Sequence, residues 1–314
     1  MISIRRRSAL RGTVTAVAVA MAATAGTAFA AGDPTGPEQA RGAAVAEHQA
    51  RQKAASAAPS ARAAAVPVTT PTFSMNAVDK QTDELYLYFA DEAGGFEPRY
   101  PVGVTFEAFA DVIDVDNDRD GWSDGTWYLH KDGTLDYNWI DDNLDHHSNE
   151  VGWNYDVYTT LLSPGDLGGA QEADLIGIDK AGVLWVYLAH PDGTVDSRVS
   201  IGKGWDQYTQ IAGQGDLTGD GRADIVARDK SGVLWLYKGT GDYKAPFAPR
   251  TEIGRGWNIY DRLLSVGDLD ADGTSDLVAR EPDGDLYRYS GTASAAVYEK
   301  PVKIGWGYDI YNLL

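Results

Sequence analysis

Short runs of alternating apolar and polar residues, separated by Gly and Asp turns, fill the chain from about residue 72 to its end. In the run VLWLY, Leu234 and Leu236 fall on one face, whereas Trp235 and Tyr237 fall on the other. This period of two is typical of a β-strand, and the apolar spacing of an amphipathic helix does not recur in this region. The sequence therefore predicts an all-β fold.

An aromatic-x-x-aromatic step returns along the chain at intervals of 49, 50, 52 and 51 residues. A repeat of about 50 residues built from short strands is typical of the four-stranded blades of a β-propeller. We expect the aromatic side chains to pack between blades rather than to stack on a ligand. The five steps are Phe106/Phe109, Tyr155/Tyr158, Trp205/Tyr208, Trp257/Tyr260 and Tyr308/Tyr311.

The two ends of the repeat region are incomplete in complementary ways. The segment from Phe73 to Pro98 matches only the later strands of a repeat, and the segment from Ile304 to Leu314 matches only its beginning. A blade shared by these two ends would close the ring and remove exposed strand edges. We therefore predict a β-propeller of five blades, each of about 50 residues, whose closing blade combines N- and C-terminal strands.

An aspartate-rich loop, DLDADGTSDL, begins at Asp268 and has the pattern D-x-D-x-D-G-x-x-D. An EF-hand requires Glu at position 12 and flanking helices, but position 12 is Ala279 and the flanking residues read as strands. Calcium binds six to eight oxygen atoms. Positions 1, 3, 5 and 9 offer carboxylates, position 7 offers a backbone carbonyl, and Gly at position 6 permits a sharp turn.

We predict about three Ca²⁺ sites from the copies of this loop, because clustered carboxylates repel one another without a cation. The second copy, DLGGAQEAD, keeps only Asp166 and Asp174, and we expect no ion there. The expected ligands are Asp116, Asp118, Asp120, Trp122 (carbonyl) and Asp124 in the first copy, Asp216, Thr218, Asp220, Arg222 (carbonyl) and Asp224 in the third, and Asp268, Asp270, Asp272, Thr274 (carbonyl) and Asp276 in the fourth.

The repeat resembles the FG-GAP or VCBS-type repeat, which builds the N-terminal propeller of integrin α-chains and occurs in many secreted bacterial proteins. The resemblance covers residues 72–314, and the aspartate loop is its most specific feature. The sequence pattern IGxGW…GDLxxDGxxDL is similar to patterns found in exported actinobacterial proteins. The Phe-Gly and Gly-Ala-Pro motifs that give the FG-GAP repeat its name are replaced here by SVGDL and GQGDL. Five blades are expected, whereas the integrin propeller usually has seven. These departures weaken any expectation of integrin-like ligand recognition.

Residues 1–30 have a basic start, a small-residue apolar middle and Ala28-Phe29-Ala30 before Ala31, which predicts a secretory signal peptide. An uncleaved membrane anchor is the alternative, and the adjacent arginines leave the Sec and twin-arginine routes both open. Residues 31–71 are rich in Ala, Pro and Ser, so we expect a disordered linker, with transient helix near Glu38 to Ala55. The propeller domain follows at 72–314.

The formal net charge is −19, and loss of residues 1–30 with their four arginines and no acidic residue would leave −23. Such a charge argues against nucleic acid or an anionic membrane as partner and favours binding of cations. The chain has no cysteine, so an exported form relies on its core or on metal ions for stability. We expect a secreted monomer without membrane attachment after signal cleavage.

The sequence contains no G-x-S-x-G, H-E-x-x-H or glycine-rich phosphate loop. One cluster outside the repeat, DDNLDHHSNE, holds His146 and His147 among acids, and either a metal or acid-base role or simple solvation fits it. The leading hypothesis is a non-catalytic, calcium-binding recognition module for a glycan or a cell-surface or extracellular protein. The alternative is an extracellular propeller hydrolase or polysaccharide lyase. The candidate sugar-stacking residues are Trp122, Trp127, Trp139 and Trp306.

Overall fold

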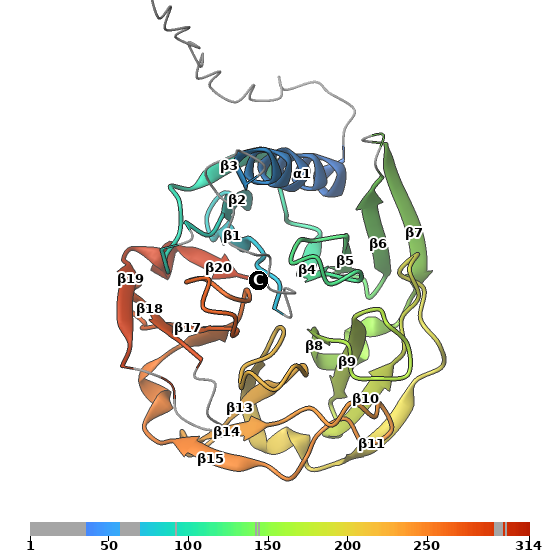
Figure 1. The fold of residues 1–314 in the computed structure, drawn as a ribbon, viewed down its shortest axis with the longest axis vertical. Helices are drawn as coiled ribbons and strands as arrows, with labels where there is room; N and C mark the ends of the chain where they lie inside the picture. The colour runs from blue at the N-terminus through green and yellow to red at the C-terminus, as the bar shows by residue number, and fades with distance from the viewer. Residues whose placement is uncertain are drawn as a thin grey trace, which may run out of the picture.

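The computed structural model describes residues 36–56, 70–91, 93–141, 143, 145–291, 298 and 300–314. The expected signal peptide, residues 1–30, lies outside the described residues. Five four-stranded antiparallel sheets form a ring around a central axis (Figure 1). The predicted all-β, five-bladed propeller is confirmed.

Each blade is a meander whose first strand lies at the axis and whose fourth strand lies at the rim. Blade 1 contains β4 (Phe109–Val115), β5 (Gly125–His130), β6 (Leu135–Ile140) and β7 (His146–Gly152). Blade 2 contains β8 (Tyr158–Gly165), β9 (Asp174–Asp179), β10 (Val183–Tyr187) and β11 (Val199–Lys203). Blade 3 contains β12 (Tyr208–Ala212), β13 (Ile225–Asp229), β14 (Leu234–Tyr237) and β15 (Thr251–Gly254). Blade 4 contains β16 (Arg262–Leu264), β17 (Leu277–Arg280), β18 (Leu286–Tyr289) and β19 (Val302–Gly305).

The closing blade has the strand order β20-β1-β2-β3, so the C-terminal strand supplies its inner position. These strands are β20 (Tyr311–Leu313), β1 (Met75–Asp79), β2 (Glu84–Tyr88) and β3 (Tyr100–Thr105). Ala77 pairs with Leu313, and Asp79 pairs with Tyr311. The predicted sharing of one blade by the two ends is therefore confirmed, and it pairs the inner edge of β1.

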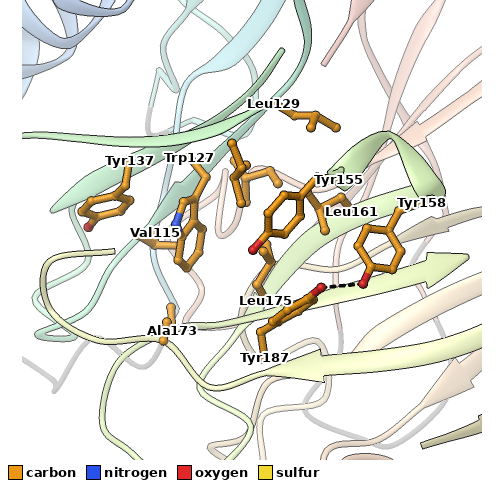
Figure 2. Close-up of a cluster of buried hydrophobic side chains, with 13 residues drawn as sticks. Val115, Trp127, Leu129, Tyr137, Tyr155, Tyr158, Leu161, Ala173, Leu175 and Tyr187 are labelled. Atoms are coloured by element: carbon orange, nitrogen blue, oxygen red, sulfur yellow. Dashed lines mark hydrogen bonds between the residues drawn. The ribbon is translucent and has the colours of Figure 1, made fainter. Parts of the chain in front are cut away.

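The core consists of five apolar clusters, and each cluster joins two neighbouring blades. Figure 2 shows the cluster between blades 1 and 2, in which Trp127 of blade 1 belongs to the same cluster as Tyr155, Tyr158 and Tyr187. The Tyr158 hydroxyl is hydrogen-bonded to that of Tyr187 at 2.5 Å. The expectation that the aromatic steps pack between blades is confirmed, because members of every step lie in one of these clusters.

Short 3-10 helices connect each of blades 1 to 4 to the next blade and carry the first aromatic of four steps. They are η1 (Tyr155–Val157), η2 (Trp205–Gln207), η3 (Trp257–Ile259) and η4 (Tyr308–Ile310). A residue with left-handed backbone precedes each one, with φ of 69° at Asn154 and 97° at Gly204. Glycine suits this conformation, which explains the second glycine of the recurrent G-x-G pattern before the aromatic residue.

Residues Pro37–Ser56, which we expected to be linker, form helix α1 in the structure, so the prediction of disorder is wrong for this segment. The helix lies at the junction of the closing blade and blade 1, near β3 and β6 (Figure 1). Ala40 and Ala44 join the apolar cluster between these blades. Among the described residues, no helix is long and apolar enough to cross a membrane.

A single arginine explains why this alanine-rich segment is ordered. Arg41 is fully buried, and its guanidinium donates to the carboxylate of Asp114 at 2.6 Å. It also donates to Asn76 at 2.7 Å and Thr126 at 3.1 Å, so strands β1, β4 and β5 all hold it. Burial alone would lower the pKa of Arg41, but Asp114 and Tyr128 raise it above its ordinary value. The alanine-rich composition predicted disorder because composition carries no information about a single buried ion pair such as that of Arg41 and Asp114.

We predict that Arg41→Ala lowers the free energy of unfolding by about 3–5 kcal/mol, because Asp114 then remains buried without its counter-ion. Chemical denaturation followed by tryptophan fluorescence measures this loss. The control is Arg51→Ala, which removes an exposed arginine of the same helix and is expected to change stability by less than about 0.5 kcal/mol. Equal effects of the two substitutions would contradict the assigned role of Arg41.

Candidate functional site

The connections between the first and second strands of blades 1 to 4 are the four aspartate loops, and they touch one another on one face of the ring. The amide of Ala173 in the second loop donates to the Asn117 side chain in the first at 3.1 Å. The amide of Ser275 in the fourth loop donates to the carbonyl of Asp216 in the third at 2.7 Å. The loops thus form a continuous layer over the axis.

Residues Pro71 and Thr72 complete this layer at the closing blade, where no loop joins β20 to β1. The Thr72 amide donates to the carbonyl of Gly121 in the first loop at 3.1 Å. The Thr72 hydroxyl donates to the carbonyl of Asp268 in the fourth loop at 2.8 Å, and the Asp268 amide donates to Pro71. The chain entering β1 therefore replaces a fifth aspartate loop.

The first and fourth loops each gather three carboxylates of the predicted ligand set. Oxygen atoms of Asp116, Asp118 and Asp124 lie within 4.8 Å of one another. Those of Asp268, Asp270 and Asp276 do the same. Calcium has oxygen ligands at about 2.3–2.6 Å, so oxygen atoms at this spacing can surround one ion.

The carboxylate at position 1 of each of these loops also shapes its own turn. Asp268 accepts the backbone amides of Asp272 at 3.1 Å and Gly273 at 2.8 Å. Asp116 accepts those of Arg119 at 2.7 Å and Gly121 at 2.9 Å. Backbone hydrogen bonds therefore hold the carboxylate at position 1 in place, and the carboxylates at positions 3 and 9 lie next to it.

Burial and mutual repulsion make these carboxylates hard to ionise without a cation. Burial raises the pKa of Asp276 to about 7, and the neighbouring carboxylates of Asp270 and Asp268 add to the shift, whereas Arg288, which pairs with Asp270 at 2.9 Å, opposes it. Burial likewise raises the pKa of Asp116 to about 7, assisted by Asp124 and Asp120. A bound divalent ion would remove this cost by compensating the negative charge.

Three predicted ligand atoms are buried and have no hydrogen-bond partner. They are Oδ1 of Asp270, Oγ1 of Thr218 and Oδ2 of Asp224. A buried polar atom without a partner is costly, so an additional ligand is the expected remedy. The donor sets of the first, third and fourth loops therefore fit a hard cation such as calcium.

The third loop is nevertheless more open than the other two. Among the described residues, its acids do not form a group of three within 4.8 Å. Position 3 is Thr218, and Asp220 lies 3.8 Å from the ammonium of Lys238. Burial raises the pKa of Asp224 to about 6.

Positions 5 and 7 have other contacts in this structure. Asp120 accepts from Lys53 of α1 at 3.0 Å, and Asp272 accepts from the hydroxyl and the amide of Thr274. The amide of Trp122 donates to Asp120 at 3.0 Å, which places position 7 beside position 5. Arg222 occupies the same place in the third loop and lines a cavity of about 190 Å³ at the axis.

The second loop contains a protein cation instead of a complete ligand set. The guanidinium of Arg119, from the first loop, forms an ion pair with Asp166. Asp174 accepts the amide of Leu167 at 2.9 Å, and burial raises its pKa to about 7. An arginine from the neighbouring blade thus compensates the loop that has lost its ligands.

The opposite face of the ring carries the connections between blades, and two tryptophans project from it. Trp306 is 79% exposed and Trp153 is 70% exposed. Each stands before the left-handed residue that caps a 3-10 helix, Gly307 before η4 and Asn154 before η1. In the other two such connections this position is Lys203 or Arg255. An exposed apolar residue follows each tryptophan four positions on, Ile310 and Val157 respectively.

The four tryptophans proposed from sequence as sugar-stacking residues lie in different environments. Trp306 is exposed, as a sugar-stacking residue requires. Trp127 is 1% exposed and belongs to the core, so its assignment is wrong. Trp139 is half-buried and stacks on His147 at 5.0 Å, and Trp122 lies under the ammonium of Lys53 at 5.8 Å. Sequence reasoning missed Trp153, although its alignment with Trp306 in the repeat was a usable signal.

The histidine cluster spans the β6–β7 hairpin. His147 pairs with Asp141 at 3.0 Å across this turn. His146 is half-buried, and its Nε2 atom has no hydrogen-bond partner. The two histidines thus differ in environment.

Comparisons with known proteins agree with this architecture. An FG-GAP-like repeat model matches residues 216–279. No curated protein sequence matches the chain.

Solved propellers resemble the fold at low sequence identity. The Dos1 propeller is 10% identical with a TM-score of 0.35, and the match covers 72% of this chain but only 57% of that one. The BBS1N structure in complex with ARL6DN is 11% identical, with coverage of 74% and 80% and a TM-score of 0.36. The six-bladed fungal lectin from Aleuria aurantia, described with a fucose recognition mode, is 15% identical, with coverage of 75% and 81% and a TM-score of 0.39. The chain is therefore a five-bladed β-propeller in which residues 216–279 match an FG-GAP-like repeat.

Proposed function

We propose that this protein is a secreted, non-catalytic β-propeller that calcium stabilises and that recognises an extracellular glycan. The observation that carries recognition is the exposure of Trp153 and Trp306 at equivalent places of two repeats. An exposed indole offers a flat apolar face on which the ring of a partner can stack. The apolar face of a sugar ring matches a single indole, whereas a protein partner would favour a larger continuous patch.

Calcium belongs to the scaffold in this proposal. The carboxylate groups of the first and fourth loops and the unpartnered ligand atoms of the third and fourth support about three sites, at the ligands named from the sequence. The ions would hold together the loop layer on the face opposite the tryptophans. The basic start of the chain and its A-x-A site support export.

Recognition is tested with a glycan array and a reducing-sugar release assay on the same purified protein. We expect binding without turnover, and Trp153→Ala or Trp306→Ala to weaken the binding of a glycan hit by about tenfold, the loss of one aromatic contact. Lys203→Ala and Arg255→Ala, at the same repeat position, serve as matched controls and should bind normally. Sugar release would favour the hydrolase or lyase alternative, and binding only to an extracellular protein would replace the glycan.

We predict that calcium raises the melting temperature and that Asp276→Asn removes most of the increment due to the fourth loop. Asp276 supplies position 9, and its carboxylate faces Asp268 and Asp270. Differential scanning calorimetry in chelator and in millimolar calcium measures the increment. Asp174→Asn, at the same position of the second loop, is the matched control and should leave the increment intact. An identical melting temperature in chelator and calcium would exclude the calcium sites.

The raised pKa values also predict the pH dependence of stability. Asp116 and Asp276 have folded-state pKa values of about 7, above the unfolded value near 4. In chelator, their contribution to stability is fully present below about pH 4 and is lost as the pH rises through about 7. Calcium keeps the carboxylates ionised, so the fall between about pH 4 and pH 7 should disappear in its presence. Thermal unfolding across this range with each additive provides the comparison.

A further inference from the structure

The first turn of α1 meets blade 1 at a cluster of one imidazole and two carboxylates. The Nε2 atom of His130, at the end of β5, lies 2.9 Å from Oδ2 of Asp136 in β6. The same Nε2 atom lies 3.7 Å from Oε1 of Glu38 in α1. All three side chains are about one-fifth exposed, so solvent reaches the cluster but does not separate its members.

The geometry suits a small divalent ion. Ligand atoms about 2.0–2.2 Å from a tetrahedral zinc ion are about 3.3 Å or slightly more from one another. The two distances at Nε2 of His130 bracket this value, and the three ligand atoms all lie within 4.8 Å. The ligands come from three separate elements and so do not depend on the flexibility of one loop.

Two other histidines, each paired with a single carboxylate, show how the surroundings of His130 differ. His190 pairs with Asp196 at 3.2 Å, and His147 pairs with Asp141 at 3.0 Å. Within the described part of the chain, only His130 makes such contacts with two carboxylates. The second carboxylate is Glu38, which α1 delivers. The imidazole nitrogen and the two carboxylates place three ligand atoms around one position, where a divalent cation would offset the two negative charges.

A further donor lies nearby without a partner. The Nε2 atom of His146, at the start of β7, is buried and makes no hydrogen bond. Burial lowers the pKa of His146, while the carboxylate of Glu38 acts in the opposite direction. A buried imidazole nitrogen without a donor is available as an additional metal ligand.

We propose that Glu38, His130 and Asp136 form a site for a divalent transition metal of the zinc class. Imidazole nitrogen combined with carboxylate oxygen suits such ions, whereas calcium prefers oxygen alone. The metal takes the place of the proton at Nε2 of His130. Because the ligands join α1 to β5 and β6, the ion fastens the helix to blade 1, on a site separate from the aspartate loops.

The test uses tag-free full-length protein in saturating calcium, so that the aspartate loops do not compete. Zinc is titrated by calorimetry, cobalt binding is followed by its visible absorption, and the melting temperature is recorded with and without zinc. We expect one zinc ion per chain and a zinc-dependent rise in melting temperature. Glu38→Gln and Asp136→Asn should each weaken zinc binding at least tenfold and abolish the rise.

The matched control is His190→Gln, which removes the histidine of a pair with one carboxylate and should leave zinc binding unchanged. Glu38→Gln is the most informative variant, because Glu38 lies in the first turn of α1 and its loss leaves the core intact. Its zinc-free melting temperature reports whether the fold is preserved. Unchanged zinc affinity in Glu38→Gln, or no zinc binding by the unaltered chain, would overturn the proposal.

Discussion

Closure of the ring is the constraint on which the rest of the structure depends. Strand β20, from the last residues of the chain, must pair with β1 in register before the closing blade has its inner strand. Each apolar cluster joins two neighbouring blades, so an open ring would expose two such faces to water. Closure therefore completes the apolar clusters on both sides of the closing blade. It also brings Pro71 and Thr72 into the layer of aspartate loops.

The junction between the closing blade and blade 1 is built differently from the other four. Here Asn138 stands where Tyr88, Tyr187, Tyr237 and Tyr289 stand in the other blades. Helix α1 covers this junction, and Arg41 supplies a buried positive charge to Asp114. The same helix brings Lys53 to the first aspartate loop and Glu38 to His130. An N-terminal segment thus acts as part of the blade junction rather than as a spacer.

The two faces of the ring carry different features. One face concentrates aspartates, whose burial and mutual repulsion favour a bound cation. Where the ligand set is incomplete, in the second loop, Arg119 provides the compensating charge. The other face carries the blade connections, where a residue before each left-handed cap is free to vary and is tryptophan twice. A repeat can therefore keep its stabilising loop while changing its outward residue.

The fold could be predicted from the sequence alone. The alternation of apolar and polar residues indicates strands, the period of about 50 residues indicates blades, and the complementary ends indicate a shared closing blade. The sequence also determined which loops have a complete set of oxygen ligands. The tertiary structure was needed to establish that Trp127 is buried, since its burial comes from packing between two blades. It likewise decided that α1 is ordered, because the partners of Arg41 lie 35, 73 and 85 residues away in the chain. Contacts between segments so distant leave no local pattern in a single sequence.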